Sequence, residues 1–175
     1  MRLREINNVN FFINWFNKKK GFDFTIDESF NDEQSPVDVI IKSKKFNKSI
    51  YIQNVAYRYG TSYAKGEPNI PGFQSITFVV GKAMLDEEIK NSILQCIRGK
   101  EKKYSTIDVK NTVLIVEITI PIIKPEKIEK LFPTGITSDF KGIYFVQLPV
   151  TMPSIEDKYG KTGFVHVLKE VLEIN

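Results

Sequence analysis

Apolar residues in the N-terminal part of the chain change from a helical spacing to a strand spacing. Between residues 3 and 18 they recur every three or four positions, which predicts an amphipathic helix. Three lysines and Gly21 follow, a typical helix end, because cations are favourable at the C-terminus of a helix. Alternating apolar and polar residues then predict strands at residues 22–26, 37–42 and 50–55.

The remainder of the chain reads as further helices and strands after an irregular stretch. Glycines and prolines interrupt residues 56–74, so we expect a long loop there, followed by an additional strand at residues 76–80. Helical spacing returns at residues 85–104, and the strongly apolar residues 112–118 predict a central strand. The last elements expected are a short helix from Pro125, a strand at residues 143–148 and a closing helix at residues 164–174.

This order of elements predicts an α/β (α+β) fold with a mixed sheet. The three strands after the first helix can pair as an antiparallel meander, and helices then cover both faces of the sheet. With 175 residues we expect a single domain spanning 1–175, with a loop insertion at about 56–83.

Composition removes several classes of chemistry. The single cysteine, Cys96, excludes an intramolecular disulfide and a CxxC zinc site, and the single histidine, His166, excludes multi-histidine metal sites. We expect both residues to have structural roles in helices. No apolar run is long enough to span a bilayer and no signal peptide is recognisable, so we expect a cytoplasmic protein without membrane contact. The net charge of +4 permits binding to nucleic acid.

Four polar side chains occupy positions where apolar residues are expected. Asp38 lies at the entry of an apolar strand, and a pairing with the next strand would bring Gln53 beside it. Lys100 lies at the centre of the apolar stripe of the helix at residues 85–104. Glu5 lies about 60° from the centre of the apolar stripe of the first helix. All four side chains have a reason to meet over the sheet.

This constellation resembles the PD-(D/E)xK nuclease-like superfamily, whose αβββαβ core matches the expected order of elements as far as residue 119. By this resemblance, Glu5 corresponds to the helix-one glutamate and Asp38 to the strand-two aspartate. The (D/E)xK motif corresponds to Gln53-Asn54-Val55. The sequence departs from the family at Gln53, where a carboxylate is usual, and at Val55, which replaces the motif lysine. The resemblance allows Lys100 to supply that lysine from the following helix.

The resemblance implies a restriction endonuclease-like fold and a metal-dependent nuclease acting on DNA. In an active enzyme Mg²⁺ (or Mn²⁺) would be held by Asp38, the side-chain oxygen of Gln53 and the backbone carbonyl of Asn54. Glu5, Asp38, Gln53 and Lys100 would be the catalytic residues, with Lys100 stabilising the developing negative charge. The alternative is a catalytically inactive nucleic-acid-binding or protein-interaction domain on the same fold.

Basic and aromatic residues mark the expected contacts with DNA. A glycine-containing loop interleaves the two types, a mixture suited to stacking on bases and to contacts with phosphates. Two runs of lysines, at residues 18–20 and 42–48, can also follow a phosphate backbone. The high aromatic content permits an exposed patch for a homodimer. The nucleic-acid-binding candidates are Lys44, Lys45, Tyr57, Arg58, Tyr59 and Lys65.

Overall fold

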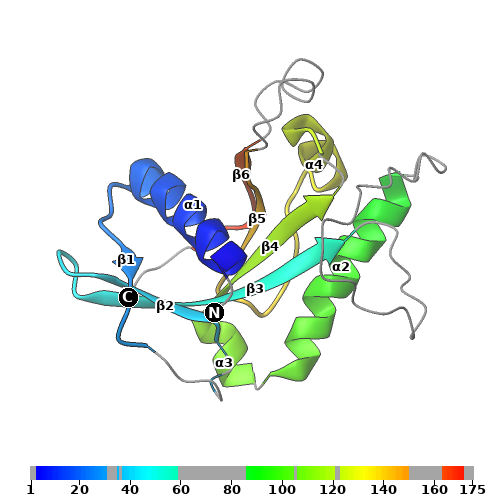
Figure 1. Ribbon diagram of the computed structural model, residues 1–175. Helices are drawn as coiled ribbons and strands as arrows, with labels where there is room; N and C mark the ends of the chain where they lie inside the picture. The colour runs from blue at the N-terminus through cyan, green and yellow to red at the C-terminus, as the bar shows by residue number, and fades with distance from the viewer. Residues whose placement is uncertain are drawn as a thin grey trace, which may run out of the picture.

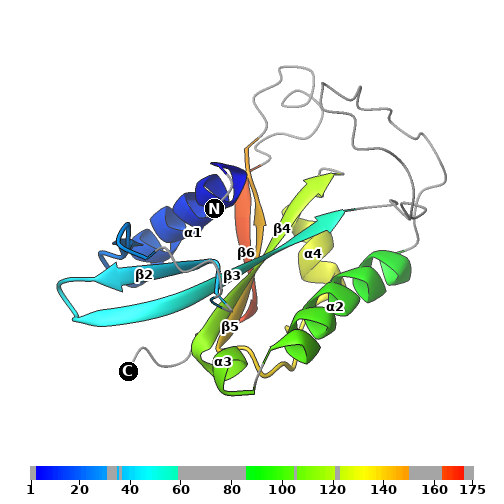
Figure 2. The same cartoon turned by 60° about the horizontal axis from the view of Figure 1, so that its bottom comes forward.

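A six-stranded mixed sheet carries helices on both of its faces (Figures 1 and 2). The computed structural model describes residues 3–30, 35, 37–58, 86–104, 106–120, 123–149 and 163–171. The strands are β1 (Thr25–Ile26), β2 (Val39–Ser43), β3 (Lys48–Arg58), β4 (Thr112–Ile120), β5 (Gly142–Gln147) and β6 (Phe164–Lys169). The helices are α1 (Leu3–Lys20), α2 (Asp86–Lys103), α3 (Thr106–Asn111) and α4 (Pro125–Leu131).

The strands lie in the sheet in the order of the sequence, β1-β2-β3-β4-β5-β6. β1, β2 and β3 form an antiparallel meander, β3, β4 and β5 are parallel to one another, and β6 returns antiparallel to β5. The mixed sheet with helices on both faces, predicted from the order of elements, is therefore confirmed. α2 and α3 make the connection that parallel pairing of β3 with β4 requires.

α1 covers one face of the sheet through the apolar stripe recognised in the sequence. Val9, Phe12 and Phe16 are buried against apolar residues of β2 to β5. The ring of Phe12 lies 4.8 Å from the ring of Tyr144 on β5. Because side chains of a strand alternate between faces, the same strands carry a second apolar set on their other side.

α2 and α4 cover that other face. Ile89, Ile93 and Ile97 of α2 are buried against Leu114 and Val116 of β4, together with the apolar residues of α4. The two helical layers, α1 on one side and α2 with α4 on the other, are visible in Figure 2. No helix in the described part of the chain is long and apolar enough to cross a membrane.

The closing helix expected at residues 164–174 is wrong, because Phe164–Lys169 is strand β6. Val165 and Val167 pack on the α1 side, whereas Phe164 and Leu168 pack on the α2 side. A strand with apolar contacts on both faces gives an apolar run that its spacing cannot distinguish from a buried helix. His166 therefore lies in a strand, opposite Phe145.

The first expected strand, residues 22–26, is shorter in the structure and comprises Thr25 and Ile26 alone. The side chain of Asn17 occupies both backbone groups of Phe24: its oxygen accepts the Phe24 N–H and its nitrogen donates to the Phe24 carbonyl, each at 2.9 Å. Those groups are consequently unavailable for a strand ladder.

Two further boundaries differ from the expectation. β3 continues through Arg58, so residues 56–58 are strand and not the beginning of the expected loop. Helix α3, which the spacing of apolar residues did not indicate, lies between α2 and β4. The remaining part of the expected loop and the strand expected at residues 76–80 lie outside the described residues.

Candidate functional site

β2 and β3 bring Asp38 and Gln53 onto neighbouring segments, as the sequence predicts. Val39, the residue after Asp38, pairs with Ile52, the residue before Gln53. The backbone N–H of Asp38 donates to the carbonyl of Ile52 at 2.9 Å, so the two segments are still in contact at this point. Asp38 precedes the paired residues of β2, so it lies beside β3 at the end of the ladder.

The carboxylate of Asp38 has a structural task at this position. Its Oδ2 accepts the backbone N–H of Asn54 at 2.6 Å. β2 begins one residue later, at Val39, so the side chain supplies the acceptor for a backbone N–H of β3 next to the start of β2. A charge-assisted hydrogen bond to a backbone N–H accounts for an aspartate at the entry of an apolar strand.

Gln53 and Lys100 belong to the same side of the sheet. Val55, two residues after Gln53, packs with the α2 cluster, so alternation places the buried Gln53 side chain on the α2 side. Lys100 lies on α2 and is half-buried, with its Nζ 5.7 Å from the centre of the Tyr104 ring. A cation over an aromatic face explains how a lysine is accommodated in this stripe.

Glu5 and the side chain of Asn54 are on the opposite side. Glu5 belongs to α1, whose layer is separated from α2 by the sheet, and the placement of its side chain lies outside what the structure describes. Asn54 alternates with Gln53 and points to the α1 side, where Ile52 is buried. Of the four predicted catalytic residues, Gln53 and Lys100 therefore lie on the α2 side, whereas Glu5 belongs to the helix on the other side.

The residues expected to hold Mg²⁺ or Mn²⁺ contain a single carboxylate, that of Asp38. Among the residues that the structure describes, no three His, Cys, Asp or Glu side chains lie close enough together to hold a metal ion. One oxygen of the Asp38 carboxylate accepts the N–H of Asn54. Because Gln53 stands where a second carboxylate is usual, the expected ligand set carries one negative charge, which favours weak binding of a divalent cation.

Three further polar side chains are buried on the α1 side of the sheet, and the sequence did not reveal them as a group. Asn8 of α1 is fully buried, Asn54 of β3 is 8% exposed and Glu117 of β4 is 3% exposed. Asn54 pairs with Ile115, so Glu117, two residues further, lies diagonally across on the same face. The available signal was a polar residue within each apolar pattern: Asn8 lies four residues before Phe12, and Glu117 follows four buried apolar residues.

Burial of the side-chain amides of Asn8 and Asn54 lowers the stability of the folded state. Neither the oxygen nor the nitrogen of either side-chain amide has a hydrogen-bond partner among the described residues. A buried polar group without a partner costs roughly 1–3 kcal/mol. Native structures contain few such groups, and the pair therefore marks this layer as a place where stability is not maximised.

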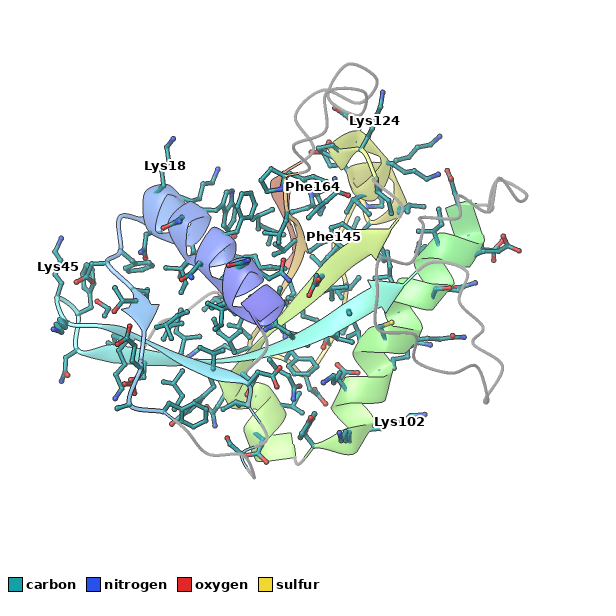
Figure 3. All side chains as sticks on the ribbon, in the orientation of Figure 1. Lys18, Lys45, Lys102, Lys124, Phe145 and Phe164 are labelled. Atoms are coloured by element: carbon teal, nitrogen blue, oxygen red, sulfur yellow. The ribbon has the colours of Figure 1, made fainter. Side chains whose placement is uncertain are left out.

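The two lysine runs noted in the sequence meet at one end of the molecule, which we call the lysine end. It consists of Lys18, Lys19 and Lys20 at the end of α1 and Lys42, Lys44, Lys45 and Lys48 around the β2–β3 turn. Figure 3 shows Lys18 and Lys45 on the same side of the molecule, projecting outward, whereas Lys102 and Lys124 lie elsewhere. Six of the seven side chains are exposed, and Lys48 is half-buried.

Asp23 connects the two parts of the lysine end. One of its carboxylate oxygens accepts the hydroxyl of Ser43, and the other accepts the backbone N–H of Lys45 at 3.2 Å. The hydrogen bond from Ser43 lowers the pKa of Asp23, so the link persists in acid better than an ordinary carboxylate would allow. The segment after α1 thereby fixes the position of the β2–β3 turn.

Most of the positive charge at the lysine end is not neutralised by the described residues. Lys42 forms an ion pair with Asp27 at 2.6 Å, and Lys20 forms one with Glu170. The other five lysines form no ion pair within the parts of the chain that the structure places. Like charges gathered on an exposed surface attract a polyanion.

The other expected nucleic-acid contacts lie away from this end or beyond the described ranges. Tyr57 and Arg58 belong to β3, at the opposite end of the strand from the β2–β3 turn, and their side chains are not placed. Tyr59 and Lys65 lie outside the described residues. Lys44 and Lys45 are therefore the members of the predicted set whose position supports an interface.

Cys96 and His166 are the single cysteine and the single histidine of the chain, and both are partly buried. Cys96 packs at the edge of the α2 cluster, and burial raises the pKa of its thiol, which disfavours the reactive thiolate. Burial lowers the pKa of His166, although Glu129 acts in the opposite direction. Cys96 therefore packs in the α2 layer, and His166 is a half-buried residue of β6.

Comparison of the chain with protein-family models, curated proteins and solved structures finds no match.

Proposed function

We propose that the chain is a nucleic-acid-binding domain that holds phosphate groups with the lysine end. The observation that supports this proposal is the meeting of two lysine runs, distant in the sequence, on one exposed end fixed by Asp23. Exposed lysines neutralise phosphates without reading the base sequence, and they supply most of the affinity in non-specific binding. The proposal does not require cleavage of the nucleic acid.

Substituting the lysine end tests the proposal. A variant with Lys18, Lys19, Lys44 and Lys45 changed to glutamine is expected to bind labelled DNA at least about tenfold more weakly at low salt. On duplex DNA, the negative slope of log K against log salt should become shallower by roughly 0.9 for each phosphate contact that is lost. Fluorescence anisotropy titrations at several salt concentrations measure both effects.

A second set of four lysines provides a control with the same change of net charge. Lys102, Lys110, Lys124 and Lys130 are exposed and lie on α2, α3, the α4 N-cap and α4. Changing these four to glutamine should leave most of the affinity intact. If both variants lose the same affinity for DNA, binding depends on net charge alone. The lysine end is then not the interface.

A metal-dependent nuclease remains the second candidate function, favoured by one observation. This is the pairing of Val39 with Ile52, which brings Asp38 and Gln53 onto neighbouring segments, with Gln53 on the same side of the sheet as α2 and Lys100. Gln53 in place of a carboxylate lowers the expected affinity for a divalent cation, so we expect no DNA cleavage in Mg²⁺ or Mn²⁺ that depends on Asp38. The assay compares the unmodified protein with Asp38→Asn and Lys100→Met. Metal-dependent cleavage that either substitution abolishes would make the nuclease the leading assignment.

A further inference from the structure

Phe46 is an exposed aromatic residue in the middle of the lysine end. Its side chain lies in the β2–β3 turn between Lys45 and Lys48 and is 39% exposed. Phe46 and Tyr51 are the large apolar residues exposed in the described part of the chain. An exposed phenylalanine surrounded by lysines combines a flat apolar surface with positive charge, the combination that binds unpaired bases and their phosphates.

The ring of Phe46 is held in place by the core. It packs edge to face against Phe22, with ring centres 5.2 Å apart and planes at 89°. Phe22 in turn contacts the rings of Phe16 and Phe24, which are buried beneath α1. A ring that is already ordered loses little conformational entropy when a partner stacks on it.

The backbone of the turn is equally constrained. The N–H of Phe46 donates to Ser43 Oγ at 3.1 Å, and the same hydroxyl donates to Asp23. Asn47 takes a positive φ of 51°, a conformation that asparagine tolerates better than most residues. The turn therefore presents Phe46 in one orientation relative to the lysines.

The neighbouring cation lies over the same ring. Lys45 Nζ is 5.1 Å from the centre of the Phe46 ring. Lys45 is exposed, so a base that stacks on this face displaces its ammonium, which stays beside the phosphates of the bound strand.

We infer that the lysine end takes single-stranded nucleic acid and stacks an unpaired base on Phe46. This inference rests on the proposed function, because it requires that the lysines bind phosphates. In a duplex each base is stacked between its neighbours, so its flat faces are covered. A ring that protrudes from the protein can stack on such a base only by separating it from a neighbour. A single strand offers a free face at every nucleotide, whatever its sequence. Phe46 thus distinguishes single strands from duplex, while the lysines bind both.

The experiment compares oligodeoxythymidine with the same strand annealed to oligodeoxyadenosine. The unmodified protein is expected to bind the single strand more tightly than the duplex. Phe46→Leu should weaken single-strand binding about tenfold, as expected for the loss of one base stacked on an aromatic ring. It should leave duplex binding unchanged. Phe46→Trp should retain the single-strand affinity, because tryptophan also offers a flat aromatic face. Tyr51→Leu, which removes a similarly exposed ring from the sheet face, should change neither affinity.

The outcomes separate this inference from the proposed function. If the fourfold lysine substitution weakens binding while Phe46→Leu does not, the lysine end binds phosphates but the stacking inference is overturned. A preference for duplex in the unmodified protein overturns it as well. Binding that is absent, or insensitive to the lysine substitutions, refutes both. Thermal unfolding of Phe46→Leu shows whether a loss of affinity reflects the ring itself or a disturbed turn, and Phe46→Trp provides the rescue.

Discussion

Replacing Asn8 by leucine is expected to raise the free energy of unfolding by about 1–3 kcal/mol. Asn8 is fully buried in the α1 layer, and its amide has no hydrogen-bond partner among the described residues. Leucine has the same branching of heavy atoms after Cβ, so the substitution removes the polar atoms while largely preserving the shape. Urea denaturation of the two proteins, analysed with a common slope, measures the difference.

Asn7 provides the control for this substitution, because it is the adjacent residue of α1 and is exposed. Leucine has a higher helix propensity than asparagine, and both variants gain that contribution equally. The difference between Asn8→Leu and Asn7→Leu therefore isolates the effect of burial. Equal stabilities would mean that the Asn8 amide is satisfied in solution, for example by an internal water molecule.

The same variant locates the binding surface. Under the proposed function, phosphates are held at the lysine end, and α1 contributes to it through its last turn. Asn8 lies on the part of α1 that faces the sheet, so Asn8→Leu should keep the affinity for DNA. A stabilised protein that no longer binds would indicate that the polar layer beneath α1, with Asn54 and Glu117, belongs to the functional site.

Gly135→Ala is expected to lower the free energy of unfolding by about 2–5 kcal/mol. Gly135 has a φ of +69°, a left-handed conformation in which an L side chain is strained. A Cβ at this position would lie 2.5 Å from the carbonyl oxygen of Leu168. That carbonyl is held by the backbone N–H of Ile136 at 2.9 Å, so it cannot move away without breaking the contact with β6.

Gly21→Ala separates the two contributions. Gly21 has nearly the same φ, +73°, but a Cβ there would meet no atom within 4 Å. It should therefore cost only the backbone strain, roughly 1–2 kcal/mol. Thermal or chemical denaturation of the two variants measures the extra cost of the collision at Gly135. Similar losses in both variants would contradict the close approach of Gly135 to Leu168.

The helices were predictable where the apolar residues of an element pack against only one side of the sheet. The stripe of α1 and the Ile89–Ile93–Ile97 row of α2 each face one side of the sheet, and their spacing identifies them as helices. β6 could not be identified in this way, because apolar residues on both faces remove the alternation that characterises a half-buried strand. The short β1 depends on the side chain of Asn17, which binds the backbone seven residues later, a contact that no periodicity reveals.

Pairing along the strands was more predictable than the convergence of side chains. The spacing of Asp38 and Gln53 was sufficient to place them on neighbouring segments, because a hairpin fixes the pairing of Val39 with Ile52 between them. Whether Glu5 could reach them depended on which face α1 covers, and a sequence does not specify this directly. The lysine end emerged from two runs that the sequence showed separately. Their meeting depends on Asp23 and on the Phe22–Phe46 contact.

The loop after α4 also determines how the sheet ends. β6 is the outermost strand, and an open edge of this kind normally offers its backbone groups to the strands of other molecules. Here the backbone of Ile136 binds the carbonyl of Leu168, and Lys169 Nζ reaches back to the carbonyls of Ser138 and Phe140. At the opposite edge β1 is only two residues long. The β6 border is therefore occupied at Leu168 and the β1 border is short, which reduces the backbone available for strand addition at the described edges of the sheet.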